Sequence, residues 1–205
     1  CVSRPEDYTL NGRDQDVAAA CRLLKQAEVA LVTLTGPPGV GKTRLALAAT
    51  QALAPFFPDG VCFVALATVS DAELVSAAIA QALGLPQRSG QSPLTTVMAH
   101  LQGQQRLLVL DNFEQVLPAA LQVADLLATC PRLKILVTSR AILHIRAEHE
   151  FPVTPLALPD PQQLPAHEQL AQVAAVELFL RRATAVKADL ALTAANAPAV
   201  AALCQ

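Results

Sequence analysis

The sequence predicts an α/β fold in which a parallel five-stranded sheet carries helices on both faces. Short β-branched or apolar runs alternate with segments of helical periodicity over the first 154 residues. The chain is 53% hydrophobic but only 3% aromatic, and this composition favours helix-rich packing over an all-β fold. Because the strands alternate with helices, they should be joined by right-handed crossovers within a parallel sheet.

The first elements are a helix, a strand, a loop and a second helix. An amphipathic helix is expected from residue 13 to about residue 27, because apolar side chains recur there every three or four positions. The β-branched run VALVTLT over 29–35 predicts the first strand. A Gly/Pro-rich loop over 36–43 then interrupts the chain, and an Ala/Leu-rich helix should follow it to about residue 54.

The next elements repeat the alternation of strand and helix. A second strand is expected over VCFVAL, residues 61–66, after the turn FFPDG. Ser70 or Asp71 can cap the following helix, which Gly84 and Pro86 should end. A polar loop over 87–93 then leads into another helix that ends near Gln102.

Three further strands are expected, two of which end on a charged residue. The strand RLLVLD is expected over 106–111, a helix over 119–130, and a fourth strand, KILVTSR, over 134–140. Residues 150–154 predict a fifth strand, and Pro152 would place it at an edge of the sheet because proline cannot donate to a strand ladder.

The loop over 36–43 reads GPPGVGKT and satisfies the pattern G-x-x-x-x-G-K-[ST] between a predicted strand and a predicted helix. Its glycines allow backbone N–H groups to approach phosphate oxygens, and the following helix adds the positive end of its dipole. Lys42 should reach the β- and γ-phosphates, and the Thr43 hydroxyl should ligate Mg²⁺. A tight turn that binds nothing is the alternative. The candidate nucleotide-binding residues are Gly36, Pro37, Pro38, Gly39, Val40, Gly41, Lys42, Thr43 and Arg44.

A phosphate loop of this kind also needs a carboxylate for the metal, and Asp111 at the end of its strand is the candidate. Its alternative role is a turn or helix cap. Asn112 could orient a water molecule, and Glu114 could accept its proton or simply begin the next helix as a solvated acid. Arg140 could contact the γ-phosphate if its strand lies beside the first strand, or it could be a solvated loop residue.

Composition and charge exclude several other classes of protein. A net charge of −2 gives no positive field for binding nucleic acid, and no apolar run is long enough to span a membrane. The five cysteines are scattered and odd in number, which fits buried thiols in the cytoplasm better than disulfides. The four histidines have no metal-ligand spacing. No guanine-reading motif is present, so adenine is the expected base.

Five segments in this order, LNGRD, GPPGVGKT, LLVLDNFE, ILVTSR and AVELFL, together resemble the NB-ARC type ATPase domain of the signal-transduction ATPases with numerous domains. The similarity is strongest to the branch found in large bacterial transcriptional regulators. It implies that the TSR strand lies between the phosphate-loop strand and the Asp111 strand, so that Arg140 senses the γ-phosphate. It also makes Arg13 a candidate contact to adenine, although Arg13 could simply begin a helix.

The resemblance implies an ATP/ADP switch with bound Mg²⁺ and weak ATPase activity, although Asn112 stands where many relatives carry a second aspartate. Residues 1–154 would be the P-loop nucleotide-binding domain with an N-terminal adenine-side segment, 155–168 a Pro-rich linker, and 169–205 the start of a helical domain. We expect the chain to be part of a longer protein, whose G-L-P motif, winged helix and sensor or effector domains would follow. The alternatives are a small-molecule phosphotransferase and an oligomeric ATPase of the AAA+ kind.

Overall fold

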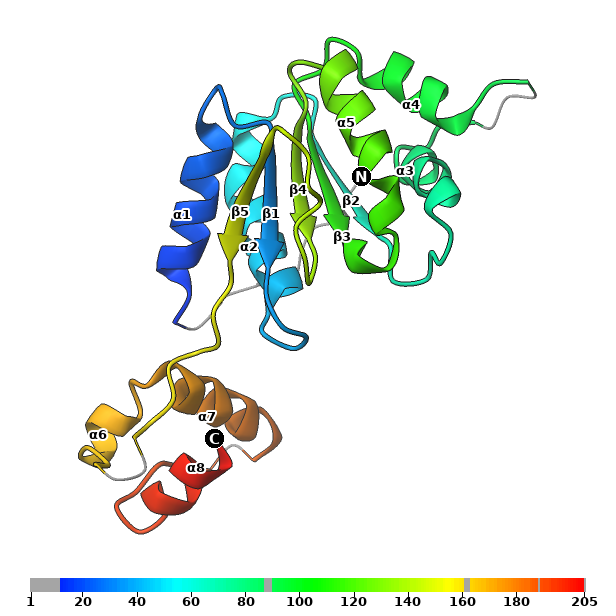
Figure 1. Cartoon of the computed structure of the whole chain (residues 1–205). Coiled ribbons are helices and arrows are strands. Elements are labelled where there is room, and N and C mark those ends of the chain that lie inside the picture. Colours follow the sequence, from blue (N-terminus) through cyan, green and yellow to red (C-terminus); the bar gives the residue numbers. More distant parts are fainter. Residues whose placement is uncertain (1–11, 87–89, 161–162, 188, 205) are drawn as a thin grey trace. The chain divides into compact units, whose positions relative to one another are not determined.

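The computed structural model describes residues 12–86, 90–160, 163–187 and 189–204, and the chain divides into two compact units. The first unit contains Asp16–Val153, and the second contains residues 12–15 together with those from Thr154 onward. Figure 1 labels the helices and strands of both units.

The first unit is built on a five-stranded parallel sheet, as predicted. Its strands lie side by side in the order β2-β3-β4-β1-β5. β4 therefore lies between β1 and β3, which confirms the strand order that the resemblance implies. The strands are β1 (Leu31–Thr35), β2 (Val61–Ala65), β3 (Leu107–Asp111), β4 (Lys134–Thr138) and β5 (Glu148–Pro152).

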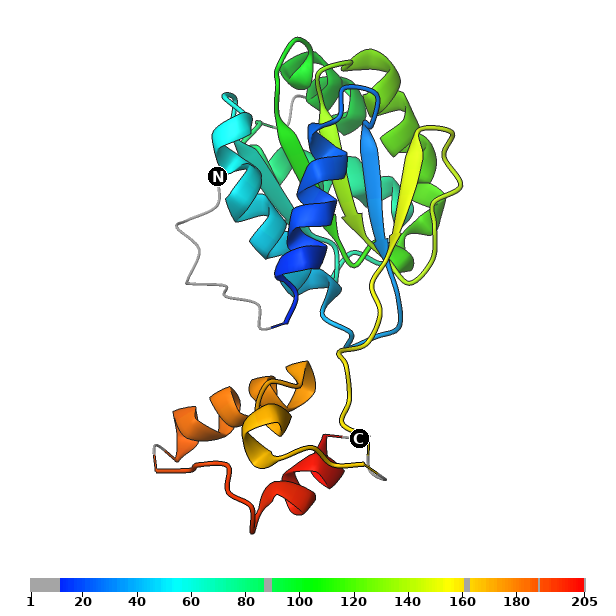
Figure 2. The same ribbon diagram turned by 90° about the vertical axis from the view of Figure 1, so that its left-hand side faces the viewer.

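Helices cover both faces of this sheet, which confirms the predicted architecture. α1 (Asp14–Lys25) and α2 (Lys42–Leu53) lie on one face, as Figure 2 shows. α3 (Val75–Ala82), α4 (Pro93–Leu101) and α5 (Ala120–Thr129) lie on the other. Single 3₁₀ turns occupy Ala54–Phe56, Ala72–Leu74, Phe113–Gln115 and Leu117–Ala119. Within the described residues, no helix has the length and apolar character needed to cross a membrane.

The core explains why the central strands are apolar along their whole length. Every residue of β1 and β3 is buried, because helices pack on both faces of a parallel sheet. Leu108 and Leu110 join Ile135 and Val137 in one cluster with side chains of α3, α4 and α5. Alternate residues of these strands point to the opposite face of the sheet. The sheet is thereby held rigidly enough to position side chains at its carboxyl edge.

The fifth strand begins earlier than predicted, at Glu148 instead of residue 150, and ends at Pro152. The reason is a pair of side-chain hydrogen bonds from β1. Thr33 Oγ1 donates to Glu148 Oε1 and Thr35 Oγ1 donates to Glu150 Oε1, both at 2.6 Å. The bond to Glu148 extends the strand two residues before its predicted start, and the bond to Glu150 holds a charged residue that the prediction already included. The edge position predicted from Pro152 is confirmed, since β5 pairs with β1 alone.

The fourth strand is shorter than predicted, because it ends at Thr138 and leaves Arg140 outside it. The chain turns at Ser139, whose Oγ accepts a hydrogen bond of 3.2 Å from the N–H of Ala141. A side-chain oxygen that accepts a backbone N–H two residues later favours a turn over a continuing strand. Arg140 is thus placed on a loop at the carboxyl end of β4.

The second unit is a small helical body with its own core. It contains α6 (His167–Leu170), α7 (Ala174–Val186) and α8 (Ala197–Leu203). Its first helix begins at His167, within the segment predicted as a linker. Leu10, Asn11 and Pro161, and part of the loop predicted over 87–93, lie outside the described residues. The buried core residues of this unit are Leu170, Val176, Ala197, Val200 and Ala201.

The cysteines of the described residues are free thiols, and three of them, Cys21, Cys62 and Cys130, are buried. Burial raises the pKa of each of these thiols. A raised thiol pKa lowers the fraction of reactive thiolate. These residues therefore act as small apolar side chains of the core.

Candidate functional site

The Gly/Pro-rich loop connects β1 to α2, which is the strand-loop-helix context predicted for it. Gly36, Gly39 and Gly41 have φ angles of 147°, 78° and 97°. A Cβ on Gly36 would lie 2.7 Å from the carbonyl oxygen of Val153, at the end of the neighbouring β5. Glycine is therefore required at Gly36 on two grounds, its φ angle and the close approach of a backbone.

Lys42 is the first residue of α2, and its side chain folds back over the loop. It is 8% exposed, and its Nζ donates to the carbonyl oxygens of Gly36 at 2.8 Å and Pro37 at 3.0 Å. The first N–H groups of α2 have no partner within their own helix. The loop thus offers an anion both N–H donors and a lysine. Arg44 lies in the same helical turn and is half-buried.

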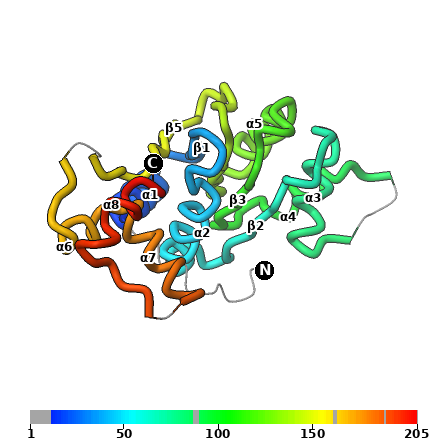
Figure 3. Tube along the Cα trace, turned by 90° about the horizontal axis from the view of Figure 1, so that it is seen from below, coloured from blue at the N-terminus to red at the C-terminus, as the bar shows by residue number. Residues whose placement is uncertain are grey.

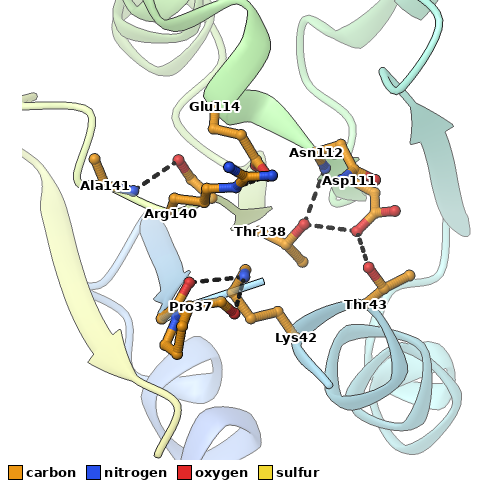
Figure 4. A network of polar contacts seen from close by, with 11 residues as sticks. Pro37, Lys42, Thr43, Asp111, Asn112, Glu114, Thr138, Arg140 and Ala141 are labelled. Carbon is orange, nitrogen blue, oxygen red and sulfur yellow. Dashed lines mark hydrogen bonds and ion pairs between the residues drawn. The ribbon is translucent and has the colours of Figure 1, made fainter. Parts of the chain in front are cut away.

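Asp111 lies at the carboxyl end of β3 and accepts two hydroxyl hydrogen bonds on one oxygen. Thr43 Oγ1 donates to its Oδ1 at 2.8 Å, and Thr138 Oγ1 donates to the same atom at 2.6 Å. Asp111 is only 5% exposed. Figure 4 shows that these three side chains come from α2, β3 and β4 and meet between the strand ends. The structure therefore joins Thr43 and Asp111, the two residues predicted to hold a metal.

The chain reverses direction immediately after Asp111, at Asn112. Asn112 has φ 62° and ψ 43°, a left-handed conformation that asparagine tolerates better than most residues. Its N–H donates to Thr138 Oγ1 at 3.0 Å. The 3₁₀ turn Phe113–Gln115 follows directly and carries Glu114. The left-handed residue thus sets the position of Glu114.

Glu114 forms an ion pair with Arg140 across the carboxyl edge of the sheet. Arg140 Nε lies 3.2 Å from Glu114 Oε1, and the two side chains are 60% and 14% exposed respectively. The second carboxylate oxygen of Glu114 is buried and accepts no hydrogen bond from any described residue. A buried carboxylate oxygen with free lone pairs can accept a proton or a hydrogen bond from a bound molecule. Figure 4 shows the pair beside Thr138 and Lys42.

Arg13 contacts the chain that follows β5. It is 4% exposed, and its Nη2 donates to the carbonyl oxygen of Thr154 at 2.7 Å. Arg13 and Thr154 both belong to the second unit. This bond ties the start of α1 to the chain that follows β5. The contact of Arg13 with adenine remains a prediction.

Thr138 is a site residue that sequence reasoning missed. It is 1% exposed and bridges the carboxylate of Asp111 and the N–H of Asn112. In the sequence, Thr138 ends one predicted strand and Asp111 ends another. Their contact can be predicted only when β3 and β4 are known to be neighbours, with Leu110 opposite Val137.

Replacing Thr138 with valine is expected to lower the free energy of unfolding by about 1–3 kcal/mol, because the partly buried N–H of Asn112 loses its acceptor and Asp111 loses a donor. Chemical denaturation measures this loss. Thr138→Ser restores the hydroxyl and should recover most of the stability, while Thr68→Val at an exposed position should change it by less than about 0.5 kcal/mol. Equal stability of Thr138→Val and the parent would contradict the bridging role.

The donor set around Thr43 and Asp111 fits a hard cation. It offers a hydroxyl and a carboxylate that lie 2.8 Å apart, and Mg²⁺ prefers such oxygen ligands. No group of three or more His, Cys, Asp or Glu side chains able to hold a metal occurs within the described part of the chain. In nucleotide sites, Mg²⁺ is commonly held by one or two protein oxygens together with phosphates and water.

A sequence model described as an AAA domain matches residues 27–148. This range includes the loop over 36–43, Asp111, Glu114 and Arg140. The matched region is more than half of the chain.

Two curated relatives come from Mycobacterium tuberculosis. One is named "Uncharacterized protein" and is 38% identical over 195 residues, which are 95% of this chain and 46% of the relative. The other is named "Putative HTH-type transcriptional regulator" and is 38% identical over 180 residues, 87% of this chain and 19% of the relative. The chain thus spans less than half the length of these relatives.

The fold is also similar to that of a solved structure, the ORC2 protein of Aeropyrum pernix in ADPNP and ADP complexes. The TM-score is 0.56 at 13% sequence identity, covering 96% of this chain and 70% of the other. At this identity the likeness concerns the fold. It agrees with the parallel sheet and the phosphate-binding type of loop described above.

Proposed function

The chain belongs to the AAA domain family, and on that premise we propose that it is an ATP/ADP-dependent switch of the NB-ARC type. One observation carries the proposal. Lys42, the Thr43–Asp111 pair and the Arg140–Glu114 pair all lie at the carboxyl edge of one sheet. A phosphate-binding group, a metal-holding pair and a charge sensor are the parts that a nucleotide switch requires.

Each part has a distinct role in binding nucleotide. Lys42 exchanges its two carbonyl partners for oxygens of the β- and γ-phosphates, and the first N–H groups of α2 bind the same phosphates. Thr43 and Asp111 would hold Mg²⁺, and the ion would neutralise phosphate charge. Adenine is the proposed base, with Arg13 as its candidate contact.

The Arg140–Glu114 pair provides the response to the γ-phosphate. Arg140 is 60% exposed and lies on the loop after β4, so its guanidinium can turn from Glu114 toward an added phosphate. This movement frees Glu114 to accept a proton from an attacking water molecule, which Asn112 helps to orient. ATP and ADP thereby give the loop two arrangements, and slow hydrolysis converts one into the other.

The switch is proposed to act within a longer cytoplasmic protein. The relatives are more than twice as long as the matching segment, and one of them bears the name of an HTH-type transcriptional regulator. Residues 1–154 are the proposed nucleotide-binding domain, 155–168 a linker, and 169–205 the start of a helical domain. Further winged-helix and sensor or effector domains would read the state of the bound nucleotide.

Amide hydrogen exchange tests the switch directly. With Mg²⁺ and a non-hydrolysable ATP analogue, residues 139–147 should exchange at least about threefold more slowly than with Mg²⁺-ADP, because Arg140 holds this loop on the γ-phosphate. The loop over 36–43 should be protected equally by both nucleotides. Identical exchange of residues 139–147 in the two states, with the loop over 36–43 protected, would leave a nucleotide site but no switch.

The family match favours one second function, an oligomeric ATPase of the AAA+ kind. In such an assembly an arginine acts on the nucleotide of the neighbouring subunit. Light scattering in the presence and absence of Mg²⁺-ATP separates the two functions. Nucleotide-dependent ring formation would favour the oligomeric ATPase, and a monomer in all states favours the switch.

A further inference from the structure

A cavity lies at the opposite edge of the sheet from the phosphate-binding loop. It has a volume of about 410 Å³, within the range of small-molecule sites. The cavity lies at the amino end of the sheet, because Lys134, the first residue of β4, lines it. Its other walls come from the end of α1, with Lys25, and from the segment after α2, with Phe56 and Phe57. α2 spans 12 residues, so about 18 Å of helix separates this cavity from the loop that begins α2.

The charged side chains that line the cavity are all cations. They are Lys25, Arg132 and Lys134. Two acids lie nearby without lining it: Asp59 accepts the N–H of Gln105 at 2.7 Å, and Glu28 interacts electrostatically with Lys134. The net charge of the whole chain is −2, so this cluster of three cations is a local excess of positive charge. The cavity therefore presents a positive field to a ligand.

Arg132 and Lys25 keep hydrogen-bond donors available for a ligand. Lys134 has none available, because its three N–H groups donate to the carbonyl oxygens of residues 26, 27 and 29. Arg132 donates to the Gly103 carbonyl and to Gln105 Oε1, which fixes its guanidinium and leaves other N–H groups unused by those bonds. Lys25 Nζ lies 3.7 Å from the centroid of the Phe56 ring, which holds the ammonium group at the cavity.

The walls of the cavity are apolar and partly exposed. The side chain of Phe56 is 49% exposed, although it is a large aromatic group, and Phe57 and Leu24 form buried walls behind it. A ligand that covers the Phe56 ring would remove apolar surface from water. An inorganic anion could use the cations but not these walls.

We propose that this cavity binds a small organic anion. Its carboxylate, sulfonate or phosphate group would lie between Lys25 and Arg132, and its flat aromatic or acyl body would pack on Phe56 and Phe57. Lys134 adds positive charge while it secures the end of α1. The site is separate from the nucleotide site and does not depend on the proposed switch.

A titration with naphthalene-1-sulfonate, followed by amide NMR of the whole chain, tests the proposal. The probe should shift the amide signals of residues 24–27, 56–57 and 132–134, and it should bind at least about tenfold more tightly than neutral 1-naphthalenemethanol. Inorganic sulfate should bind more weakly than the probe because it covers no apolar surface. Shifts confined to other residues, or equal binding of the neutral compound, would overturn the proposal.

A matched pair of double variants identifies the groups that bind the anion. Lys25→Gln/Arg132→Gln should weaken binding of the probe at least about tenfold, since two charge-assisted contacts are lost. Arg182→Gln/Lys187→Gln removes the same charge from exposed positions of the second unit and should leave the affinity within about twofold. Phe56→Ala provides an independent loss of the aromatic wall. Unchanged affinity in both the Lys25/Arg132 and Phe56 variants would refute the site.

Discussion

Replacing Lys42 with alanine is expected to abolish the thermal stabilisation that Mg²⁺-ATP gives the protein. A ligand at a hundred times its dissociation constant stabilises a protein by about 2.7 kcal/mol. For a chain of this size that corresponds to a rise in Tm of roughly 5–10 °C. The reason for the loss is local. Lys42 Nζ is the buried cation of the loop, and its two present partners are carbonyl oxygens that nucleotide phosphates can replace.

The Lys42→Ala variant must be compared with its own nucleotide-free state. Removal of two hydrogen bonds to the loop carbonyls lowers its starting stability by about 1 kcal/mol, so only the rise on adding nucleotide is informative. Lys187→Ala is the matched control, since Lys187 is exposed and lies in the second unit. It should retain the full rise. A full rise in Lys42→Ala would exclude the loop over 36–43 as the nucleotide site.

Replacing Glu114 with glutamine is expected to reduce ATP hydrolysis at least about a hundredfold, because a positioned general base contributes 10²–10⁴ to the rate. Nucleotide affinity should change little, because Lys42, Thr43 and Asp111 remain. The structural basis is the second carboxylate oxygen of Glu114, which is buried and accepts no hydrogen bond from the described residues. Phosphate release under single-turnover conditions measures the rate.

The ion pair between Glu114 and Arg140 requires a second variant for this test. Glu114→Gln also weakens the pair, so a slower reaction could arise from Arg140 alone. Arg140→Gln keeps the carboxylate and removes the proposed γ-phosphate contact. It should lower the ratio of ATP to ADP affinity, whereas Glu114→Gln should leave that ratio within about twofold. If Asn112→Ala stops hydrolysis while Glu114→Gln does not, the water-orienting residue is Asn112 and Glu114 is not the base.

Local patterns were sufficient to predict the sheet and to select the residues of the candidate site. Glycines and prolines placed the break between β1 and α2, and short strand-type runs placed all five strands within two residues of their observed ends. Asp111 was predicted because a phosphate-binding loop needs a carboxylate for the metal, and this acid ends an apolar run. These features depend on residues a few positions apart, and therefore they can be recognised along the chain.

Features that depend on register could not be recognised in that way. β5 was predicted, but it begins two residues earlier than expected, at Glu148, whose carboxylate accepts a hydrogen bond from Thr33 of the distant β1. The role of Thr138 likewise requires β4 to lie beside β3. The hydrogen bond from Arg13 to the carbonyl of Thr154, 141 residues away, could not be predicted from the local motif either, and the contact of Arg13 with adenine stays a prediction.

The phosphate-binding loop, the aspartate at the end of β3 and the alternation of strands and helices are therefore properties of short segments of this sequence. The pairing of Glu114 with Arg140 is a property of the folded chain. It exists because Asn112 adopts a left-handed turn and because β4 ends at Thr138, two residues before the arginine. Neither condition is encoded in the periodicity of side chains. The turn at Asn112 is held by a hydrogen bond to Thr138 of the neighbouring strand, and β4 ends where Ser139 Oγ accepts the N–H of Ala141.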